Sequence, residues 1–329
     1  MRRLIGKGIG TGWRWLAIAA VALASGTASA QTFPTKPLQI VVPYNPGGAV
    51  DTVARIVGPQ LAKQLGQNVL IVNKPGASGN IGAELVVRSP ADGYTMLLGA
   101  NPLASSPSLK KHLPYDPLKD LATVARVGYA PLVLVVPTSS PVKTVHDLIE
   151  LAKKKAGAMN YGSAGVGGSG HLATELLKHV TGMEATHVPY SGGSPAMVDL
   201  VGGRLDFMII NPLEAAPRVE AGKLRAIAVS SKHRLALLPN VPTFAESGVK
   251  NYQASVWWGF LVPSATPKAI VNKLSSEILQ ALKDPTVRKK LIAQGAVVEP
   301  LDAAGFHKFL AAETAKWADV IHMAGIPAN

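Results

Sequence analysis

The fold is decided by the stretch Leu38-Gln39-Ile40-Val41-Val42-Pro43-Tyr44-Asn45-Pro46-Gly47-Gly48, together with residues 49–65 that follow it. Its first five residues form an apolar, largely β-branched run, which is typical of a buried parallel strand. Residues 49–65 carry apolar side chains at the spacing of one helix face. We therefore predict a strand, a glycine turn and a helix. Because the first N–H groups of a helix have no intrahelical partner and the helix dipole adds positive charge there, this junction can bind an anion.

The same unit returns in residues 69–87, 159–181 and 186–201. A single glycine-rich turn of this kind usually does no more than reverse the chain in an α/β protein. Four of them predict several helix N-termini that can converge on one cleft, which would then hold a small, negatively charged molecule. The first strands alternate with helices, and this order predicts a parallel sheet with ligands at the carboxyl ends of its strands.

Further elements follow from apolar runs and caps. Strands are expected at 95–99, 132–136, 207–210, 224–229 and 256–262, and helices at 81–88, 144–155, 267–282, 285–294 and 303–323. Asn80 is interpreted as the N-cap of the helix at 81–88, and Thr144 with Asp147 as a capping box. About 300 residues at 47% hydrophobic composition can bury two ordinary cores, so two domains are expected.

The first 30 residues have the pattern of a secretory signal peptide. Four basic residues precede or flank an apolar stretch at 15–24, and Ala28-Ser29-Ala30 is an A-x-A cleavage site. The alternative is a membrane anchor, but the apolar stretch is well short of the roughly 20 residues that span a bilayer. We expect cleavage near Ala30, Gln31 at the mature N-terminus and a soluble protein in the periplasm.

The chain is basic, with a formal net charge of +13, and loss of the leader's four basic residues leaves +9. A basic chain suggests nucleic-acid binding. However, the lysines are scattered, and the one dense run, 153–155, closes a predicted helix, where cations suit the dipole. Aromatic residues are too sparse to form a stacking platform. The charge is interpreted as a solvated surface that attracts anions.

No catalytic or metal-binding pattern is recognised. The chain has no cysteine, which excludes disulfides and thiol chemistry. Ser169 and His171 do not complete the G-x-S-x-G pattern of a nucleophile elbow, and the histidines lack the spacing of metal ligands. We expect no catalytic residue, no metal and no cofactor.

One enzymatic alternative stays open. Gly165-x-Gly167-x-x-Gly170 matches the dinucleotide-binding fingerprint after a strand and before a helix, as in an NAD-dependent oxidoreductase. The acidic residue expected about 20 positions further on is missing, since Glu184 comes too early. Export would also separate the chain from cytosolic NAD.

Short motifs in order along the mature chain carry a resemblance to a known family. They are Phe33-Pro34-x-Lys36-Pro37, Val42-Pro43-Tyr44-x-Pro46-Gly47-Gly48-x-x-Asp51, Gly79-Asn80-Ile81-Gly82, Asp92-Gly93-Tyr94-Thr95, Tyr161-Gly162-Ser163-Ala164-Gly165-x-Gly167, His171-Leu172, Val188-Pro189-Tyr190, Gly202-Gly203-x-x-Asp206 and Trp258-Gly259-x-x-x-Pro263. Each motif alone is unspecific, but the ordered set is specific. The chain resembles the extracytoplasmic solute receptors of tripartite tricarboxylate transporters, the TctC-like or Bug proteins.

The resemblance implies a periplasmic solute-binding protein with a two-domain α/β fold, type II-like, in which each domain is a sheet flanked by helices and both close on a central cleft like a Venus flytrap. Domain 1 would combine residues 31–131 and 254–329, and domain 2 would be 132–253. The implied partners are a small carboxylate (a di- or tricarboxylate, an aromatic acid or an amino acid) and the membrane subunits of such a transporter. Neither an enzymatic activity nor nucleic-acid binding is implied, and we expect a monomer.

Family members bind carboxylates through backbone N–H groups, hydroxyls and bridging waters, typically without an arginine clamp. The residues expected at the site are Tyr44, Gly47, Gly48, Asp51, Asn80, Asn101, Ser163, Ala164, Gly165, Ser169, His171, Tyr190, Asp206 and Trp258. Some roles stay open: Asp51 either caps a helix or binds ligand, and Tyr190 and Trp258 either line the carbon skeleton or pack. Asp206 is interpreted as a turn residue, because like charges repel. The main expectation is a clamp in which Gly47-Gly48 and 163–165 bind one anion.

Overall fold

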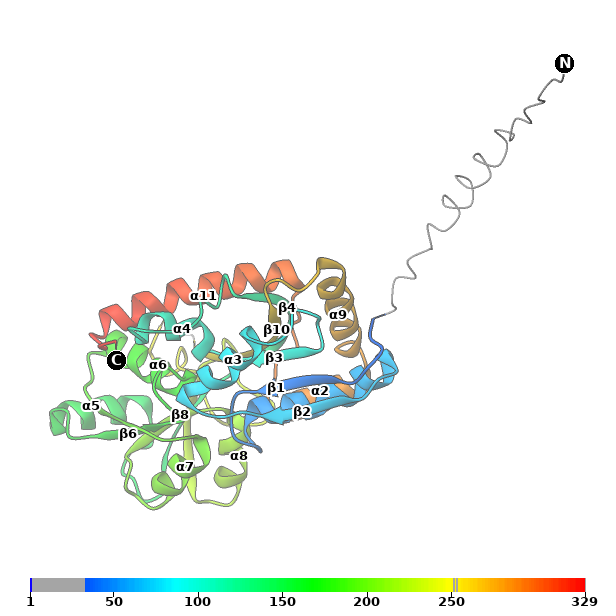
Figure 1. The fold of residues 1–329 in the computed structure, drawn as a ribbon. Coiled ribbons are helices and arrows are strands. Elements are labelled where there is room, and N and C mark those ends of the chain that lie inside the picture. The colour runs from blue at the N-terminus through cyan, green and yellow to red at the C-terminus, as the bar shows by residue number, and fades with distance from the viewer. Residues whose placement is uncertain (2–32, 251, 253, 329) are drawn as a thin grey trace. The chain divides into compact units, whose positions relative to one another are not determined.

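The computed structural model describes residues 33–250, 252 and 254–328, together with Met1. Apart from Met1, the predicted signal peptide lies outside the described residues. The folded body is Lys36–Asn329, coloured from blue to red along the chain in Figure 1. Among the described residues, no helix combines the length and the hydropathy that crossing a bilayer requires.

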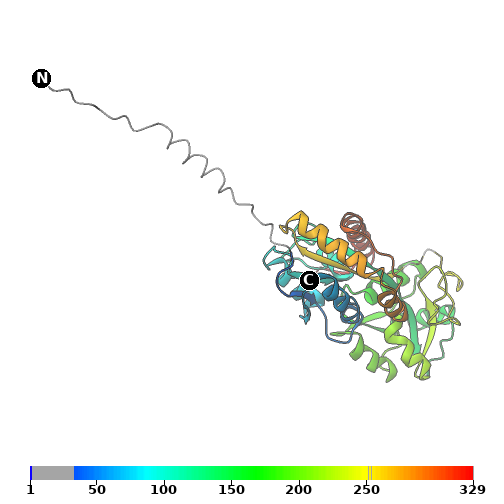
Figure 2. The same ribbon diagram turned by 90° about the vertical axis from the view of Figure 1, so that its right-hand side faces the viewer.

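The body is built on two five-stranded sheets. The first has the strand order β2 (Val69–Asn73), β1 (Leu38–Val42), β3 (Thr95–Gly99), β10 (Ser255–Pro263) and β4 (Leu121–Pro131). The second has the order β7 (Thr186–Pro189), β6 (Asn160–Ser163), β8 (Phe207–Ile210), β5 (Val133–Pro137) and β9 (Leu224–Val229). Figures 1 and 2 both show the green and yellow elements of the second sheet gathered apart from the blue and orange elements of the first.

Helices connect the strands and cover the sheets. They are α2 (Ala49–Leu65), the 3-10 turn η1 (Ala77–Gly79), α3 (Asn80–Val87), α4 (Pro102–Leu109), α5 (Val145–Lys155), α6 (Ser169–Thr181), α7 (Gly193–Val201), α8 (Pro212–Glu220), α9 (Lys268–Ala281), α10 (Pro285–Ala293) and α11 (Ala303–Met323). Helices α2 and α9 contact each other beside the first sheet, and α7 and α8 contact strands of the second. The long α11 contacts β4, α4 and α6, so it joins elements of both sheets.

The predicted strand–turn–helix units and the parallel pairing of the first strands are confirmed, but each sheet also contains one antiparallel strand. Strands β1, β2 and β3 pair in parallel as predicted. Strand β10, which comes from the end of the chain, pairs antiparallel with both β3 and β4. Strand β5 likewise pairs antiparallel with β8 and β9 in the second sheet. Each sheet is therefore mixed, because one strand enters it through a connection other than a βα crossover.

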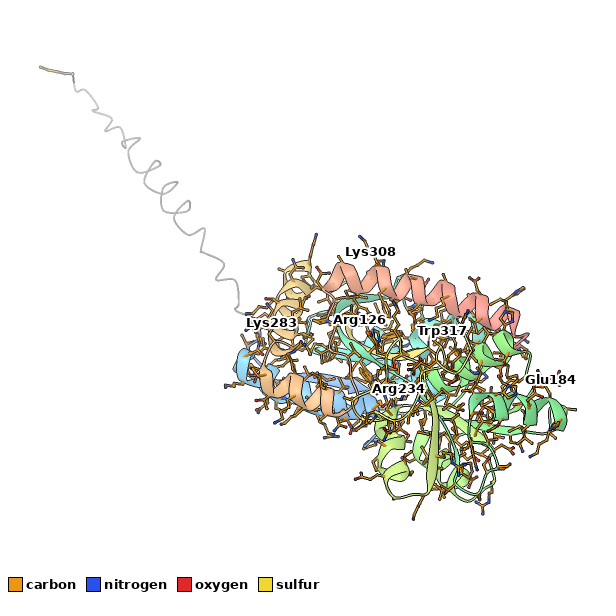
Figure 3. All side chains as sticks on the ribbon, turned by 180° about the vertical axis from the view of Figure 1, so that it is seen from behind. Arg126, Glu184, Arg234, Lys283, Lys308 and Trp317 are labelled. Atoms are coloured by element: carbon orange, nitrogen blue, oxygen red, sulfur yellow. The ribbon has the colours of Figure 1, made fainter. Side chains whose placement is uncertain are left out.

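Strand β4 has no counterpart in the sequence-based prediction. Thr123, Arg126 and Gly128 interrupt its apolar sequence, so the sequence pattern does not indicate a strand there. The buried Arg126 donates to the carbonyl of Glu299 at 3.0 Å, and its guanidinium lies 4.5 Å from the ring centre of Phe309 on α11. Figure 3 labels Arg126 of β4 and Trp317 of α11, and both side chains are almost fully buried. The charge is tolerated in the core because α11 and residues 297–301 give it partners.

Local signals predicted most helices closely. Helices α2 and α11 have the predicted bounds, and the capping box of Thr144 and Asp147 is present at α5. The interpretation of Asn80 as an N-cap is wrong, because α3 begins at Asn80 and Gly79 precedes it. The side chain of Asn80 instead donates to the carbonyl of Ala77 and accepts from the hydroxyl of Tyr115 at 2.7 Å.

The chain passes from one sheet to the other twice. Strand β4 ends at Pro131 and β5 begins at Val133, and the chain returns between β9 and β10, after Val229. The predicted domain boundaries, 131/132 and 253/254, fall in these two connections and stay a prediction. Each sheet has its own cluster of buried apolar side chains, one around Trp257, Phe306 and Trp317 and the other around Leu200 and Met208.

Candidate ligand-binding site

A pocket of about 250 Å³ lies where βα loops from both sheets meet. Its volume is at or below the roughly 300–1,000 Å³ of pockets for drug-sized ligands, so it suits a small metabolite. The lining residues are Tyr44–Pro46, Gly48–Val50, Ser78, Ala100–Pro102, Ser163–Gly165, Gly168–Gly170, Ser191–Pro195, Met208–Asn211, Glu214 and Val256. The N-terminal ends of α2, α4, α6, α7 and α8 all contribute to this list. Of the four predicted units, three bring the N-terminus of their helix (α2, α6 and α7) to this pocket, whereas the N-terminus of α3 does not line it, and α4 and α8 contribute instead.

On the first-sheet side, Asp51 holds the β1–α2 loop without lining the pocket. Its carboxylate accepts the N–H of Gly47 at 2.9 Å, the Nε of Arg55 at 2.8 Å and the Nδ2 of Asn73 at 3.0 Å. Burial opposes ionisation of this carboxyl, but the hydrogen bonds from Arg55, Gly47 and Asn73 outweigh burial and lower its pKa. Asp51 thus shapes the loop that brings Gly48 to the pocket.

Asn101 ties the β3–α4 junction to β10. Its side chain is fully buried, donates to the carbonyl of Ser255 at 2.8 Å and accepts the N–H of Trp257 at 3.1 Å. Because both ends of the amide are used, Asn101 fixes the position of the α4 N-terminus at the pocket wall. Trp258, the next residue of β10, is buried and does not line the pocket.

On the second-sheet side, the glycine-rich loop between β6 and α6 is shaped by close packing. Gly167 has a φ of +76°, and a Cβ there would lie 2.5 Å from Leu109 and 2.9 Å from Ser105 on α4. A Cβ at Gly170 would overlap the carbonyl oxygen of Ile209 on β8. These contacts explain the glycines of the G-x-G-x-x-G pattern without a dinucleotide. The first glycine of the pattern, Gly165, has a φ of +129° and lines the pocket.

Ser163 belongs to a buried, uncharged network at the end of β6. Its hydroxyl accepts the N–H of Gly165 at 3.2 Å and lies 2.6 Å from Nε2 of His187, whose ring stacks on that of His171 at 4.0 Å. Burial lowers the pKa of His187 to about 3 and that of His171 to about 4, so both rings are neutral at pH 7. His171 accepts the N–H of Gly167 through Nδ1 and is directed into the loop, away from the pocket lining.

Two further expected residues form contacts outside the pocket lining. The hydroxyl of Tyr190 donates to Asp199 at 2.7 Å. The carboxylate of Asp206 accepts the N–H of Asn160 at 2.7 Å and pairs with Lys155. The arrangement of Asp206 matches its interpretation as a turn residue, because it joins the starts of β6 and β8.

Half of the expected site residues line the pocket: Tyr44, Gly48, Asn101, Ser163, Ala164, Gly165 and Ser169. The others are not among its lining residues: Gly47, Asp51, Asn80, His171, Tyr190, Asp206 and Trp258. Sequence reasoning missed Asn45, Ser78, Ser191, Ser194, Asn211 and Glu214, among others. The glycine-rich turn at 191–193 and the strand that ends at Ile210 were signals that could have indicated several of them.

The exposed surface of the pocket is mostly apolar, with polar groups at a few positions. Among the residues that the structure describes, neither a lysine nor an arginine lines the pocket, and Glu214 is the one acidic residue that does. Positive potential comes instead from the N–H groups and dipoles of the converging helices. Hydroxyl and amide side chains of Ser78, Ser169 and Asn45 add hydrogen-bonding groups. Such a site can hold an oxyanion through neutral donors.

Two mixed α/β sheets with a ligand-sized pocket between their βα loops define the class of two-domain periplasmic binding proteins. The family model described as "Tripartite tricarboxylate transporter family receptor" (TctC) matches residues 53–326. The chain belongs to this family. It is 37% identical over 302 residues to Protein BugT of Bordetella pertussis, covering 90% of this chain and 92% of that protein. It is 36% identical over 314 residues, or 92% of each chain, to a UPF0065 protein of Pseudomonas sp. strain P51.

Solved structures agree. The chain is similar to Rpa4515 of R. palustris with adipate, with a TM-score of 0.86 and 36% identity over 90% of this chain and all of that one. It is also similar to MatC (Rpa3494) of Rhodopseudomonas palustris with bound malate, with a TM-score of 0.81 and 31% identity over 88% of this chain and all of that one. The predicted family, fold class and solute-binding role are confirmed, and no comparison supports the oxidoreductase alternative.

Proposed function

We propose that this protein captures a small carboxylate in the pocket between its two sheets and delivers it to the membrane subunits of a tripartite tricarboxylate-type transporter. The observation that carries the proposal is the convergence of five helix N-termini on one pocket. The dipole of each helix adds partial positive charge where its N-terminus meets the pocket, and this charge favours a carboxylate. The adipate and the malate of two similar structures belong to the same chemical class.

The clamp is formed by loops from both sheets. Gly48 lies at the N-cap of α2, and Ser163–Gly165 approach the pocket from β6. A Cβ at Gly165 would lie 3.2 Å from Oγ of Ser78, so the two sides come close there even without ligand. A ligand whose oxygens accept from both loops would bridge the two sides and stabilise their closed arrangement.

The setting of this function is the periplasm. The leader pattern supports export and cleavage near Ala30, and binding without chemical change is expected because no catalytic arrangement was recognised. We propose that the mature protein is a monomer of two domains, 31–131 with 254–329 and 132–253, that hinge at the two connections between the sheets. The same leader predicts Gln31 or a neighbouring residue as the N-terminus of protein recovered from the periplasm.

The proposal is tested by calorimetric titration of mature protein with adipate, malate, succinate, citrate, benzoate, nicotinate and glutamate, with NAD as the test of the alternative. One carboxylate should bind, and at about a hundred times its Kd it should raise the unfolding free energy by about 2.7 kcal/mol. Mass spectrometry of the released ligand should recover it unchanged. Turnover of that ligand, or saturable NAD binding without carboxylate binding, would overturn the proposal.

A further inference from the structure

Glu214 gives one end of the pocket an acidic character that a general carboxylate site does not need. It lies in the first turn of α8 and lines the pocket next to the α7 N-terminus. A Cβ at Gly193 would overlap its carboxylate, so the two are in close approach. No other lining residue that the structure describes is acidic or basic, so Glu214 is the residue that can give this end of the pocket a charge.

The carboxylate of Glu214 has no hydrogen-bond or ion-pair partner among the residues that the structure describes. Arg218, one turn further along α8, donates to the main-chain carbonyl of Glu214 at 2.8 Å and not to its carboxylate. Burial raises the pKa of Glu214, and the charge of Arg218 opposes that shift. The side chain is half-buried at the pocket wall, so its carboxylate oxygens are available to a hydrogen-bond donor from a ligand.

The position of the Glu214 carboxylate determines which chemical group of a ligand can bind beside it. The N-termini of α7 and α8 favour a negative charge at this end of the pocket, and Glu214 already supplies one. A second carboxylate from the ligand would meet like-charge repulsion there. The N-termini of α2 and α6, where no acidic residue lines the pocket, remain open to a ligand carboxylate.

We propose that the carboxylate of Glu214 accepts hydrogen bonds from the ammonium group of a zwitterionic ligand. The pocket would then bind an amino acid more tightly than the carboxylic acid that has the same carbon skeleton but lacks the amino group. The inference rests on the proposed function and narrows its ligand class. The ligand's carboxylate lies against the α2 and α6 termini, and its ammonium group donates to Glu214. A hydrogen bond between two charged groups in a partly desolvated site is among the stronger ones, so the amino group should matter.

The test uses matched pairs that differ only by an amino group: succinate and L-aspartate, glutarate and L-glutamate, adipate and L-2-aminoadipate. Each is titrated calorimetrically into mature wild-type protein and into the Glu214→Gln and Glu220→Gln variants. Glutamine keeps the size of the side chain and removes its charge. Glu220 is an exposed residue of the same helix and serves as the matched control.

In at least one pair, the amino acid should bind the wild type at least tenfold more tightly than its partner. Glu214→Gln should abolish that preference, and Glu220→Gln should keep it. Equal or tighter binding of the unsubstituted diacid by the wild type would overturn the inference and leave the proposed function standing, as would a preference that survives Glu214→Gln. The wild-type titrations test the preference for amino acids without any variant, so the inference can be overturned even if Glu214→Gln does not fold. If no carboxylate binds at all, the proposed function fails and the inference fails with it.

Discussion

The β1–α2 and β8–α8 junctions each place an acidic residue in the first turn of a helix at the pocket, and they use it in opposite ways. Asp51 of α2 is 3% exposed, has three hydrogen-bond donors and does not line the pocket. Glu214 of α8 lines the pocket and has no partner for its carboxylate among the described residues. The same local position therefore supports a structural carboxylate on one side of the pocket and a recognition group on the other.

The difference shows that a helix N-terminus does not by itself reveal what its acidic residue does. Arg55, one turn further along α2, reaches the carboxylate of Asp51, whereas Arg218, one turn along α8, reaches only a backbone carbonyl. Asp51 also has a partner from outside its helix, because the amide of Asn73 in β2 donates a third hydrogen bond to its carboxylate. A satisfied carboxylate stabilises the fold, and an unsatisfied one remains available to a ligand.

Among the substitutions, the largest expected effect is on stability, from Asp51→Ala. The substitution leaves the N–H of Gly47 and the amide of Asn73 without their acceptor, so the free energy of unfolding should fall by about 3 kcal/mol. Urea unfolding followed by circular dichroism measures the change. The control is Glu150→Ala, which removes an exposed ion pair with Lys153 and should cost less than about 1 kcal/mol. Equal losses in both variants would contradict the structural role of Asp51.

The next effect is on binding, from Gly165→Val. A branched side chain is strained at a φ of +129°, and its Cβ would press on Ser78, so the loop should shift and the affinity for the bound carboxylate should fall at least thirtyfold. Gly182→Val is the matched control, because Gly182 also has a positive φ, +67°, but lies in open space away from the pocket lining. Calorimetric titration of both variants decides. Unchanged affinity in a folded Gly165→Val protein would remove this loop from the proposed clamp.

The buried histidines and Asp51 should affect stability in different pH ranges. The folded pKa values of His171 and His187 lie below the unfolded value of about 6.5, so the unfolded chain takes up more protons as the pH falls from 6.5 toward 4. Stability should be full above pH 6.5 and decrease below it, by up to about 1.4 kcal/mol per pH unit for each histidine that stays neutral. The lowered pKa of Asp51 acts in a separate window, because its contribution is lost only below about pH 3.8.

This pH dependence is measured from urea midpoints between pH 7.5 and 4.5. His171→Gln should flatten the slope, since it removes one of the two buried titrations. His146→Gln, at an exposed position, should leave the slope as it is. A wild-type stability that stays constant across this range would mean that the two rings are protonated in the folded protein.

The smallest expected effect is that of Glu214→Gln on the stability of the ligand-free protein, in contrast to Asp51→Ala. Glu214→Gln removes a charge that has no partner in the described structure, so the ligand-free protein should change in unfolding free energy by less than about 1 kcal/mol. A gain is more consistent with the structure than a loss. A loss above about 2 kcal/mol would show that Glu214, like Asp51, holds the fold together.

Much of the fold follows from local sequence signals. The helix face of residues 49–65, the capping box of Thr144 and Asp147, and the strand–glycine–helix order were all predictable, because each depends on residues a few positions apart. The family motifs and the convergence of βα loops on one pocket also followed from the sequence. These features need no knowledge of which strand lies beside which.

Only the tertiary structure decided the rest. Strand β4 depends on pairing with β10, more than 120 residues away, and its buried Arg126 depends on Phe309 and Glu299. Seven expected site residues do not line the pocket, since a side chain's direction depends on partners such as Asn73 for Asp51 or Asp199 for Tyr190. The acidic character of the pocket was likewise hidden, because nothing local distinguishes Glu214 from a solvated residue in a first helical turn. Burial and the missing partner are properties of the assembled loops, and they exist only once both sheets are in place.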